Sequence, residues 1–234
     1  MKVVKPGTEI LTPIDADAIL QRIEVAGRRC YKSEDKITPD SAKKFVRGIM
    51  SSGHHSVIEH ESVSVNFIIP RGISHELVRH RLAAYSQEST RYCNYAKKGE
   101  KGEVTFILEP AHHSDHAKYE SVLRSDEEAG FISDDYYDWR SICSHAEKIY
   151  LRRRGRGISP QIARNGLPIA LKTEIVATYN LRTWRHIFQL RAAGTTGKPH
   201  PQMLEVMIPL LAEFKEKIPV IFDDIEPMAM PEFK

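Results

Sequence analysis

Apolar and polar side chains alternate in the segment "ESVSVNFIIP", which spans residues 61–70. The alternating apolar positions are Val63, Val65, Phe67 and Ile69. A period of two is that of a strand with one buried face, and Pro70 closes the strand because it has no amide hydrogen to donate. We therefore predict a strand over residues 62–69.

Most of the remaining chain has the apolar spacing of amphipathic helices. The predicted helices span residues 14–29, 39–52, 73–84, 114–154 and 203–214. An acidic break, "SDEEAGFISDD", divides the fourth helix, and Pro209 predicts a kink in the fifth, whose apolar face suits a core or a subunit interface. A second strand is predicted in "EVTFILEP", whereas "LPIALKTEIVATYN" is compatible with a strand or a helix.

The composition predicts one domain. The chain has 234 residues, of which 41% are hydrophobic, and this suffices for one substantial core. We expect a single α/β domain over residues 1–234, a twisted sheet with flanking helices. Cys30, Cys93 and Cys143 have no CxxC spacing, which favours a reducing compartment and predicts a cytoplasmic protein. No apolar run reaches the roughly 18 residues that a membrane span needs, so no membrane role is predicted.

Basic residues gather in three stretches, 71–91, 152–164 and 182–191, although the net charge is only +3. Local positive potential of this kind attracts anionic ligands. The run "RRRGRG" in the second stretch would suit a nucleic-acid-binding module, but the chain has no RNP, KH or zinc-finger signature. Small anionic ligands are therefore favoured, and no nucleic-acid partner is expected.

The first basic stretch contains "RHRLAAYSQESTR". In the predicted helix 73–84, Glu76, Arg79 and His80 share one face. The apolar contacts of this helix are expected from Leu77, Val78 and Leu82. One interpretation is a solvated basic face with a weak i,i+4 ion pair. The second is a phosphate site, which is favoured by the polar side chains that follow: Ser86, Gln87, Ser89, Thr90 and Arg91.

A histidine-rich segment, "SGHHSVIEH", contains His54, His55, Glu59 and His60. Its spacing is neither HExxH nor HxxEH, so these zinc signatures are absent and no metal is expected. Three interpretations stay open: a metal hydrolase site, histidines hydrogen-bonded to local backbone, and polar groups that line a ligand pocket.

The segment "NLRTWRHIFQLR" predicts a helix with Trp184 and Phe188 on one face and His186 on another. Arg191 extends the apolar face, where an unpaired guanidinium is costly unless an anionic or carbonyl-rich partner meets it. It is equally placed to be the favourable cation of the helix C-terminus. Arg164, at the end of an element in "QIARNGLP", has the same two interpretations.

Taken together, these motifs resemble the flavin-dependent thymidylate synthase family. "RHRLAAYSQES" is similar to the family signature of RHR, seven residues and Ser. "HHSVIEH" resembles its His-x-x-x-x-Glu-His segment, "ARNGLP" its Arg-x-x-Leu-Pro, "NLRTWRHIFQLR" its Asn-x-Arg helix ending in Leu-Arg, and His200 a following histidine. The matches run in family order from about residue 54 to residue 202, which is most of the chain.

Carried over residue by residue, the resemblance implies three sets of site residues. Those implied to bind flavin are Ser56 from a neighbouring subunit, Arg79, His80, Arg81, Gln87, Asn180, Leu181, Arg182 and His186. Those implied to bind deoxyuridine monophosphate (dUMP) are Glu76, Leu77, Val78, Arg79, Gln87, Glu88, Ser89, Thr90, Arg91, Arg164 and Arg191. Three residues are implied in catalysis. Arg191 would meet the uracil ring and favour its ionisation. Ser89 would be mainly a substrate contact, and His54 would lie at the flavin and folate edge of the site.

The implied reaction is the FAD-dependent reductive methylation of dUMP to thymidine monophosphate (dTMP). Methylenetetrahydrofolate would donate the carbon and NADPH would be the reductant. A flavin hydride would replace the cysteine nucleophile of unrelated thymidylate synthases, and none of the three cysteines falls in the motifs. The resemblance also implies the family's α/β fold and a homotetramer with active sites shared between subunits.

The chain departs from the family at position 76, where Glu76 replaces the usual Gln. A carboxylate near a nucleotide phosphate repels it unless a cation pairs with the carboxylate. The sequence predicts Arg79, His80 or His75 as that partner.

Overall fold

The computed structural model describes residues 1–97, 102–124 and 130–233. Its strands are β1 (Lys2–Val4), β2 (Gly7–Ile10), β3 (Ser62–Pro70), β4 (Ala84–Gln87), β5 (Thr105–Ile107) and β6 (Lys172–Asn180). Its α-helices are α1 (Ala16–Arg29), α2 (Ser41–Ser51), α3 (Arg71–Leu77), α4 (His113–Arg124), α5 (Asp134–Gly155), α6 (Pro160–Ala163), α7 (Leu181–Arg191) and α8 (Pro201–Lys217). Its short 3-10 turns are η1 (Glu34–Lys36), η2 (His55–His60), η3 (Tyr95–Lys97), η4 (Pro110–His112) and η5 (Arg164–Gly166).

A four-stranded antiparallel sheet in the order β2-β3-β6-β4 forms the centre of the fold. β3 and β6 pair along their full lengths, from Ser62 opposite Asn180 to Pro70 opposite Lys172. The strand predicted over residues 62–69 is therefore confirmed. The segment that fitted a strand or a helix contains β6, whose alternate residues are buried.

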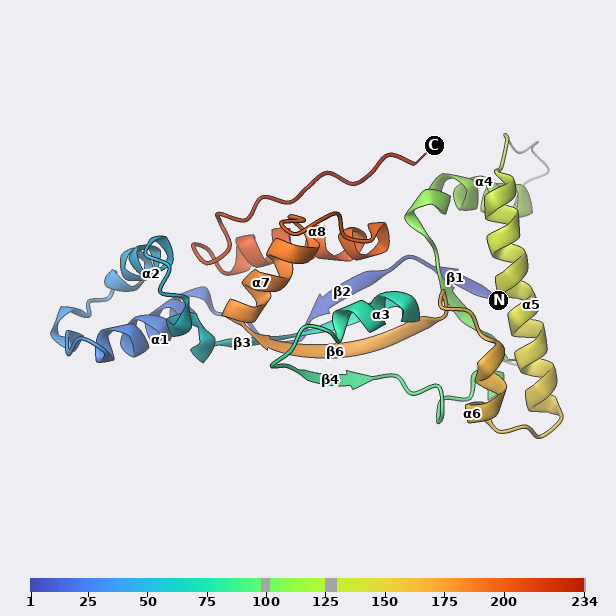
Figure 1. The fold of residues 1–234 in the computed structure, drawn as a ribbon, viewed down its shortest axis with the longest axis horizontal. Helices are drawn as coiled ribbons and strands as arrows, with labels where there is room; N and C mark the ends of the chain where they lie inside the picture. The colour runs from blue at the N-terminus through green and yellow to red at the C-terminus, as the bar shows by residue number, and fades with distance from the viewer. Residues whose placement is uncertain (98–101, 125–129, 234) are drawn as a thin grey trace.

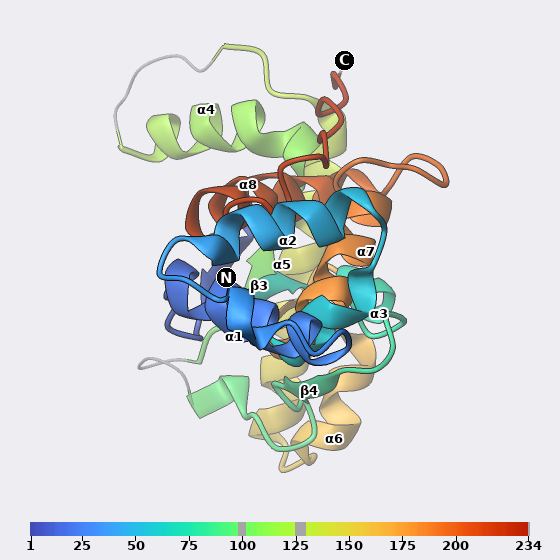
Figure 2. The same ribbon diagram turned by 90° about the vertical axis from the view of Figure 1, so that its left-hand side faces the viewer.

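Helices cover the sheet and extend beyond its two ends. α7 and α8 lie over one face, α1 and α2 project from one end, and α4, α5 and the parallel pair β1–β5 lie at the other (Figure 1). Figure 2 shows α1 and α2 packed side by side at their end. Trp184 is fully buried between sheet and helices, and its Nε1 donates to the Val63 carbonyl oxygen at 3.0 Å. The indole thereby fixes α7, and the site residues it carries, against β3.

The helix predictions hold except at α3. α1, α2, α7 and α8 lie where the apolar spacing placed them, and the buried face of α8 belongs to the core. α4 and α5 flank the acidic break, part of which, residues 125–129, lies outside the described residues. In the part of the chain that is described, no helix has both the length and the hydrophobicity that crossing a membrane requires.

Candidate functional site

The RHR segment leaves its helix earlier than predicted. α3 ends at Leu77 and Ala84–Gln87 form β4, so the helix prediction is wrong from residue 78 onward. The Tyr85 hydroxyl lies 3.0 Å from the Leu77 carbonyl oxygen and also contacts the carbonyl oxygen of His80, which satisfies acceptors at the helix end. Leu82 has a φ of 59° and is 88% exposed, so the apolar contact expected of it was wrong.

A polar cluster joins this segment to the end of α7. The Arg191 Nε donates to His80 Nε2 at 3.1 Å, and the Arg191 Nη1 pairs with Glu76 Oε2 at 3.1 Å. The rings of His80 and His186 lie 6.5 Å apart between centroids. Burial, reinforced by the charges of Arg191 and His186, lowers the pKa of His80 to about 4. His80 is therefore neutral near pH 7 and accepts through Nε2.

This cluster answers two questions that the sequence left open. The cation that pairs with Glu76 is Arg191, so the expected partners Arg79, His80 and His75 were wrong. Arg191 has the anionic partner that its place on an apolar face required, and it is also the last residue of α7. Both interpretations of Arg191 therefore hold.

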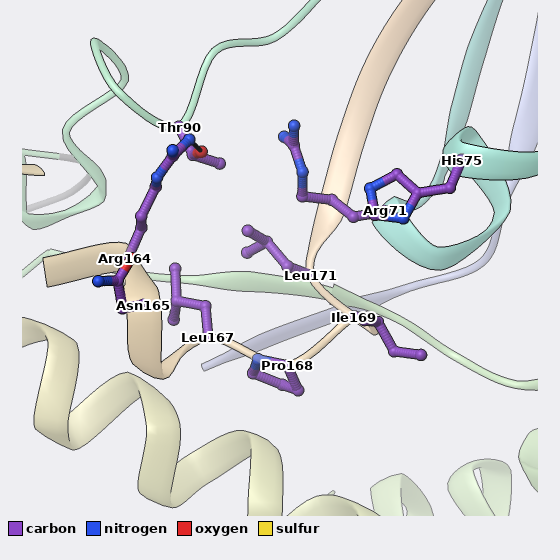
Figure 3. Close-up of a pocket in the computed structure, with 9 residues that line it drawn as sticks. All are labelled: Arg71, His75, Thr90, Arg164, Asn165, Leu167, Pro168, Ile169 and Leu171. Carbon is purple, nitrogen blue, oxygen red and sulfur yellow. Dashed lines mark hydrogen bonds between the residues drawn. The ribbon is translucent and has the colours of Figure 1, made fainter. Parts of the chain in front are cut away.

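A pocket of about 340 Å³, here called the Arg164 pocket, opens beside α3 (Figure 3). Its lining residues are Arg71, His75, Thr90, Arg164, Asn165, Leu167, Pro168, Ile169 and Leu171. The Arg164 Nη1 donates to Thr90 Oγ1 at 2.6 Å, and Figure 3 shows Arg71 on the opposite side of the pocket. The lining contains two guanidinium groups and no carboxylate, so the pocket suits an anion.

Of the predicted nucleotide residues near Thr90, only Thr90 itself lines this pocket. Ser89 and Arg91 do not line it: Ser89 Oγ accepts from the Arg91 amide at 3.3 Å, and the exposed Arg91 guanidinium lies over the Tyr92 ring. Gln87 donates to Ser74 Oγ at 2.8 Å within the protein. Only Thr90 of this run meets Arg164.

Three other residues predicted to bind the nucleotide, Glu88, Leu77 and Val78, do not line this pocket. The Glu88 carboxylate is held by Tyr95, whose hydroxyl donates at 3.0 Å, and by Lys172 at 3.2 Å. Leu77 is fully buried, as its predicted apolar role required, whereas Val78 is partly exposed and carries little of that role.

A second pocket of about 390 Å³, here called the His186 pocket, lies where β6 passes into α7. Its lining residues are His55, Glu59, Arg81, Leu82, Asn180, Arg182, Thr183, Arg185, His186 and Gln189. Asn180 caps α7, because its Oδ1 accepts from the Thr183 amide at 2.8 Å. Arg182 pairs with Glu59 at 2.5 Å. Four of the residues implied to bind flavin, Arg81, Asn180, Arg182 and His186, thus come together here.

The donors of the His186 pocket fit a flavin dinucleotide. Arg81 has no carboxylate partner among the described residues, and the amides of Asn180 and Gln189 add neutral hydrogen-bonding groups beside it. A diphosphate needs such donors. Leu181 is fully buried, and Arg79 is exposed outside the lining.

His54 lines neither the Arg164 pocket nor the His186 pocket. It lines a third cavity, of about 450 Å³, between α1 and α2, together with Arg28, Lys44 and Phe45. Ser56 is exposed on η2. Among the described residues no group of histidine, cysteine and acidic side chains is arranged to hold a metal ion. His54 and Ser56 line neither of the two pockets, although His55, which lies between them in the sequence, lines the His186 pocket.

Sequence reasoning missed Arg71, His75 and Asn165 as pocket residues. Arg71 carried one signal, since it begins the basic stretch 71–91. The missing information was tertiary: the pocket closes only when the loop that carries Arg164 packs opposite α3. Arg185 was also missed; it is buried and pairs with Asp224.

Comparisons with known proteins identify the family and the fold. The family described as thymidylate synthase complementing protein matches residues 14–220. A flavin-dependent thymidylate synthase of Corynebacterium diphtheriae is 31% identical, over 91% of this chain and 80% of its own. One of Mycobacterium sp. (strain KMS) is 34% identical, over 91% and 82%. A UMP/dUMP methylase, PolB from Streptomyces cacaoi, solved with 5-Br dUMP, has the same fold, with a TM-score of 0.74 and 22% identity over 95% and 96% of the two chains.

Proposed function

The chain belongs to the flavin-dependent thymidylate synthase family, and from this premise we propose that it methylates dUMP to dTMP. The family resemblance and the α/β fold predicted from the sequence are confirmed. We further propose FAD as the bound cofactor, methylenetetrahydrofolate as the carbon donor and NADPH as the reductant.

The observation that carries the proposal is that one stretch of chain, α3 with the RHR segment, contributes residues to both pockets. Arg71 and His75 line the Arg164 pocket, and Arg81 lines the His186 pocket. Between them, Glu76 and His80 both bind Arg191. We infer that Arg191 acts between a ligand of one pocket and a ligand of the other, as a transfer between two bound molecules requires.

We assign dUMP to the Arg164 pocket and flavin to the His186 pocket. Arg164 and Thr90 would bind the nucleotide phosphate, and Arg191 would direct its guanidinium to the uracil ring, where it stabilises negative charge. Arg81, Arg182, Asn180 and His186 would bind FAD. When bound, FAD supplies the reducing equivalents that the methylation needs.

The cysteines support chemistry without a thiolate. Within the described residues no cysteine lines the Arg164 or the His186 pocket. Burial raises the pKa of the Cys143 thiol to about 12, so it stays protonated near pH 7. Ser89 has no base hydrogen-bonded to its hydroxyl among the described residues, which leaves it a substrate contact.

We propose that the enzyme is a homotetramer in which His54 and Ser56 of one chain complete a site on another. Neither His54 nor Ser56 lines the Arg164 pocket or the His186 pocket of its own chain, which supports this assembly. Sedimentation should show a species about four times the 26.7 kDa chain. A protein that is purely monomeric, yet fully active, would exclude shared sites.

The activity is tested with purified protein that has been supplied with FAD and desalted. We expect a retained visible flavin band that shifts when dUMP is added, and dTMP formation when methylenetetrahydrofolate and NADPH are both present under reducing conditions. Deoxyuridine, which lacks the phosphate, is the matched control and should produce little shift. Protein that retains no flavin and forms no dTMP would exclude the proposed function.

A further inference from the structure

Arg71 occupies a position that no family motif assigns. It follows Pro70 at the start of α3, and its amide donates to the Leu171 carbonyl oxygen at 2.9 Å. Its Nη1 lies 3.1 Å from the Glu88 carbonyl oxygen and 3.4 Å from Thr173 Oγ1. One edge of the guanidinium is therefore bound to the protein, while the side chain borders the Arg164 pocket (Figure 3).

The groups that hold Arg71 are themselves fixed. Thr173 is fully buried on β6, and its hydroxyl also receives Gln87 Nε2 at 3.2 Å. The Glu88 side chain is anchored by Tyr95 and Lys172, so the carbonyl oxygen that Arg71 uses is kept in place. A guanidinium held in this way loses little freedom when it binds a ligand.

The charge of Arg71 is not balanced locally. Neither Arg71 nor Arg164 forms an ion pair with a carboxylate among the described residues, and both are only partly exposed. Two facing guanidinium groups repel each other unless an anion lies between them. A phosphate monoester, with a charge near −2, can bind both guanidinium groups at once.

Arg91, which the motif assigns to the nucleotide, lies elsewhere in this chain. Its guanidinium is 5.4 Å from the centroid of the exposed Tyr92 ring and does not line the pocket. The second guanidinium that faces Arg164 is thus Arg71. An apolar floor, with Leu167 and Leu171, lies between the two.

We propose that Arg71 is a nucleotide-binding residue, which clamps the phosphate of dUMP from the side opposite Arg164. This inference rests on the proposed function, because it takes dUMP as the ligand of the Arg164 pocket. It adds a phosphate contact that neither the sequence motifs nor the comparisons assign.

The test measures binding of dUMP to the FAD-loaded protein by equilibrium dialysis. Arg71→Ala should weaken dUMP binding about 10- to 100-fold, because a charge-assisted bidentate contact is lost. Arg71→Lys keeps the charge but not the fork and should fall between Arg71→Ala and the wild type. Arg47→Ala removes an exposed arginine of α2 that lines none of these pockets, and should leave binding unchanged.

Two further readouts separate a phosphate contact from a folding defect. Deoxyuridine should bind wild type and Arg71→Ala equally weakly, and inorganic phosphate should compete with dUMP less effectively in Arg71→Ala. Retained flavin and an unchanged melting temperature would show that the variant is folded. If Arg71→Ala unfolds, Arg71→Gln, which can still donate to Glu88, replaces it in the same comparison.

The outcomes distinguish this inference from its premise. Wild-type protein that binds no dUMP would overturn the proposed function and the inference with it. Wild-type protein that binds dUMP, beside an Arg71→Ala variant that binds it equally well, would overturn the inference alone.

Discussion

The two pockets differ in how their guanidinium groups are balanced. In the Arg164 pocket, Arg71 and Arg164 face each other without a carboxylate partner in the described part of the chain. In the His186 pocket, Arg182 pairs with Glu59 at 2.5 Å, and Arg185, which is 3% exposed, binds Asp224. The first pocket keeps its positive charge for a ligand, whereas most of the charge in the second is already paired within the protein.

This difference shows why a count of basic residues does not locate an anion site. The stretch 182–191 is as basic as the stretch 71–91 in sequence, yet Arg185 is a structural residue whose two bonds to Asp224 are 2.6 and 2.7 Å long. The charge that is open to a ligand depends on which carboxylates the fold brings to each guanidinium.

The largest effect is expected at Arg191. Arg191→Ala should lower kcat by about 10²- to 10³-fold, because it removes the cation that we propose stabilises negative charge on the uracil ring. Flavin retention should stay near that of the wild type, since Arg191 does not line the His186 pocket. Steady-state assays of dTMP formation measure this, with Arg47→Ala as control. An Arg191→Ala enzyme within about tenfold of wild type would contradict the assignment.

A paired comparison separates the pockets directly. Arg164→Ala should weaken dUMP binding by about 10- to 100-fold and leave flavin affinity unchanged, because it removes a charged contact in one pocket only. Arg182→Ala should lower flavin affinity instead, and by less, because Glu59 already shares its charge. Equilibrium dialysis against dUMP and against FAD measures the two affinities in each variant. Equal losses of both ligands in both variants would mean that the pockets are not distinct.

The fold was predicted best where periodicity is strong. The alternation of Val63, Val65 and Phe67 fixed β3 because a period of two is incompatible with a helix. The helix that should have run to residue 84 ended at Leu77, because the Tyr85 hydroxyl contacts the carbonyls there and β4 pairs with β6. A long-range hydrogen bond and a strand partner leave no local signal in sequence.

The site was predicted in part. Motif matching identified Arg164, Thr90, Arg81 and His186, which line the two pockets. It could not find Arg71, whose role depends on a loop about ninety residues away folding opposite it. Nor could spacing reveal that Glu76 pairs with Arg191, because α3 and α7 meet only in the folded chain.

The ion pair between the buried Arg185 and the exposed Asp224 predicts a loss of stability. Asp224→Ala removes both carboxylate bonds and leaves Arg185 with the Ile221 carbonyl oxygen. The free energy of unfolding should fall by about 1 to 3 kcal/mol, because a buried guanidinium loses its counter-ion. Urea denaturation measures it. Glu226→Ala, which breaks the exposed pair with Lys215, is the matched control and should cost less than about 0.5 kcal/mol.

If both variants lost the same small amount, Arg185 would not depend on Asp224. The contrast with the Arg164 pocket would then rest on Arg182 and Glu59 alone, a pair whose side chains are half exposed.

The smallest expected effect is the pH dependence that His80 imposes between the pockets. Its pKa is about 4 in the folded protein, where burial is the main cause, and about 6.5 in the unfolded chain. Between these values the unfolded chain binds more protons, so the free energy of unfolding decreases as the pH falls. From about pH 7 to about pH 5.5 the wild type should therefore lose about 1 kcal/mol more than His80→Gln, which has no proton to gain.

Urea denaturation at several pH values measures this difference, and His60→Gln, an exposed histidine of η2, is the control. His60→Gln should follow the wild-type curve, because the His60 side chain is exposed to solvent in the folded protein as it is in the unfolded chain. If His80→Gln follows the wild-type curve as well, His80 is not buried as a neutral acceptor. Arg191 would then depend on Glu76 alone to hold it between the nucleotide and the flavin.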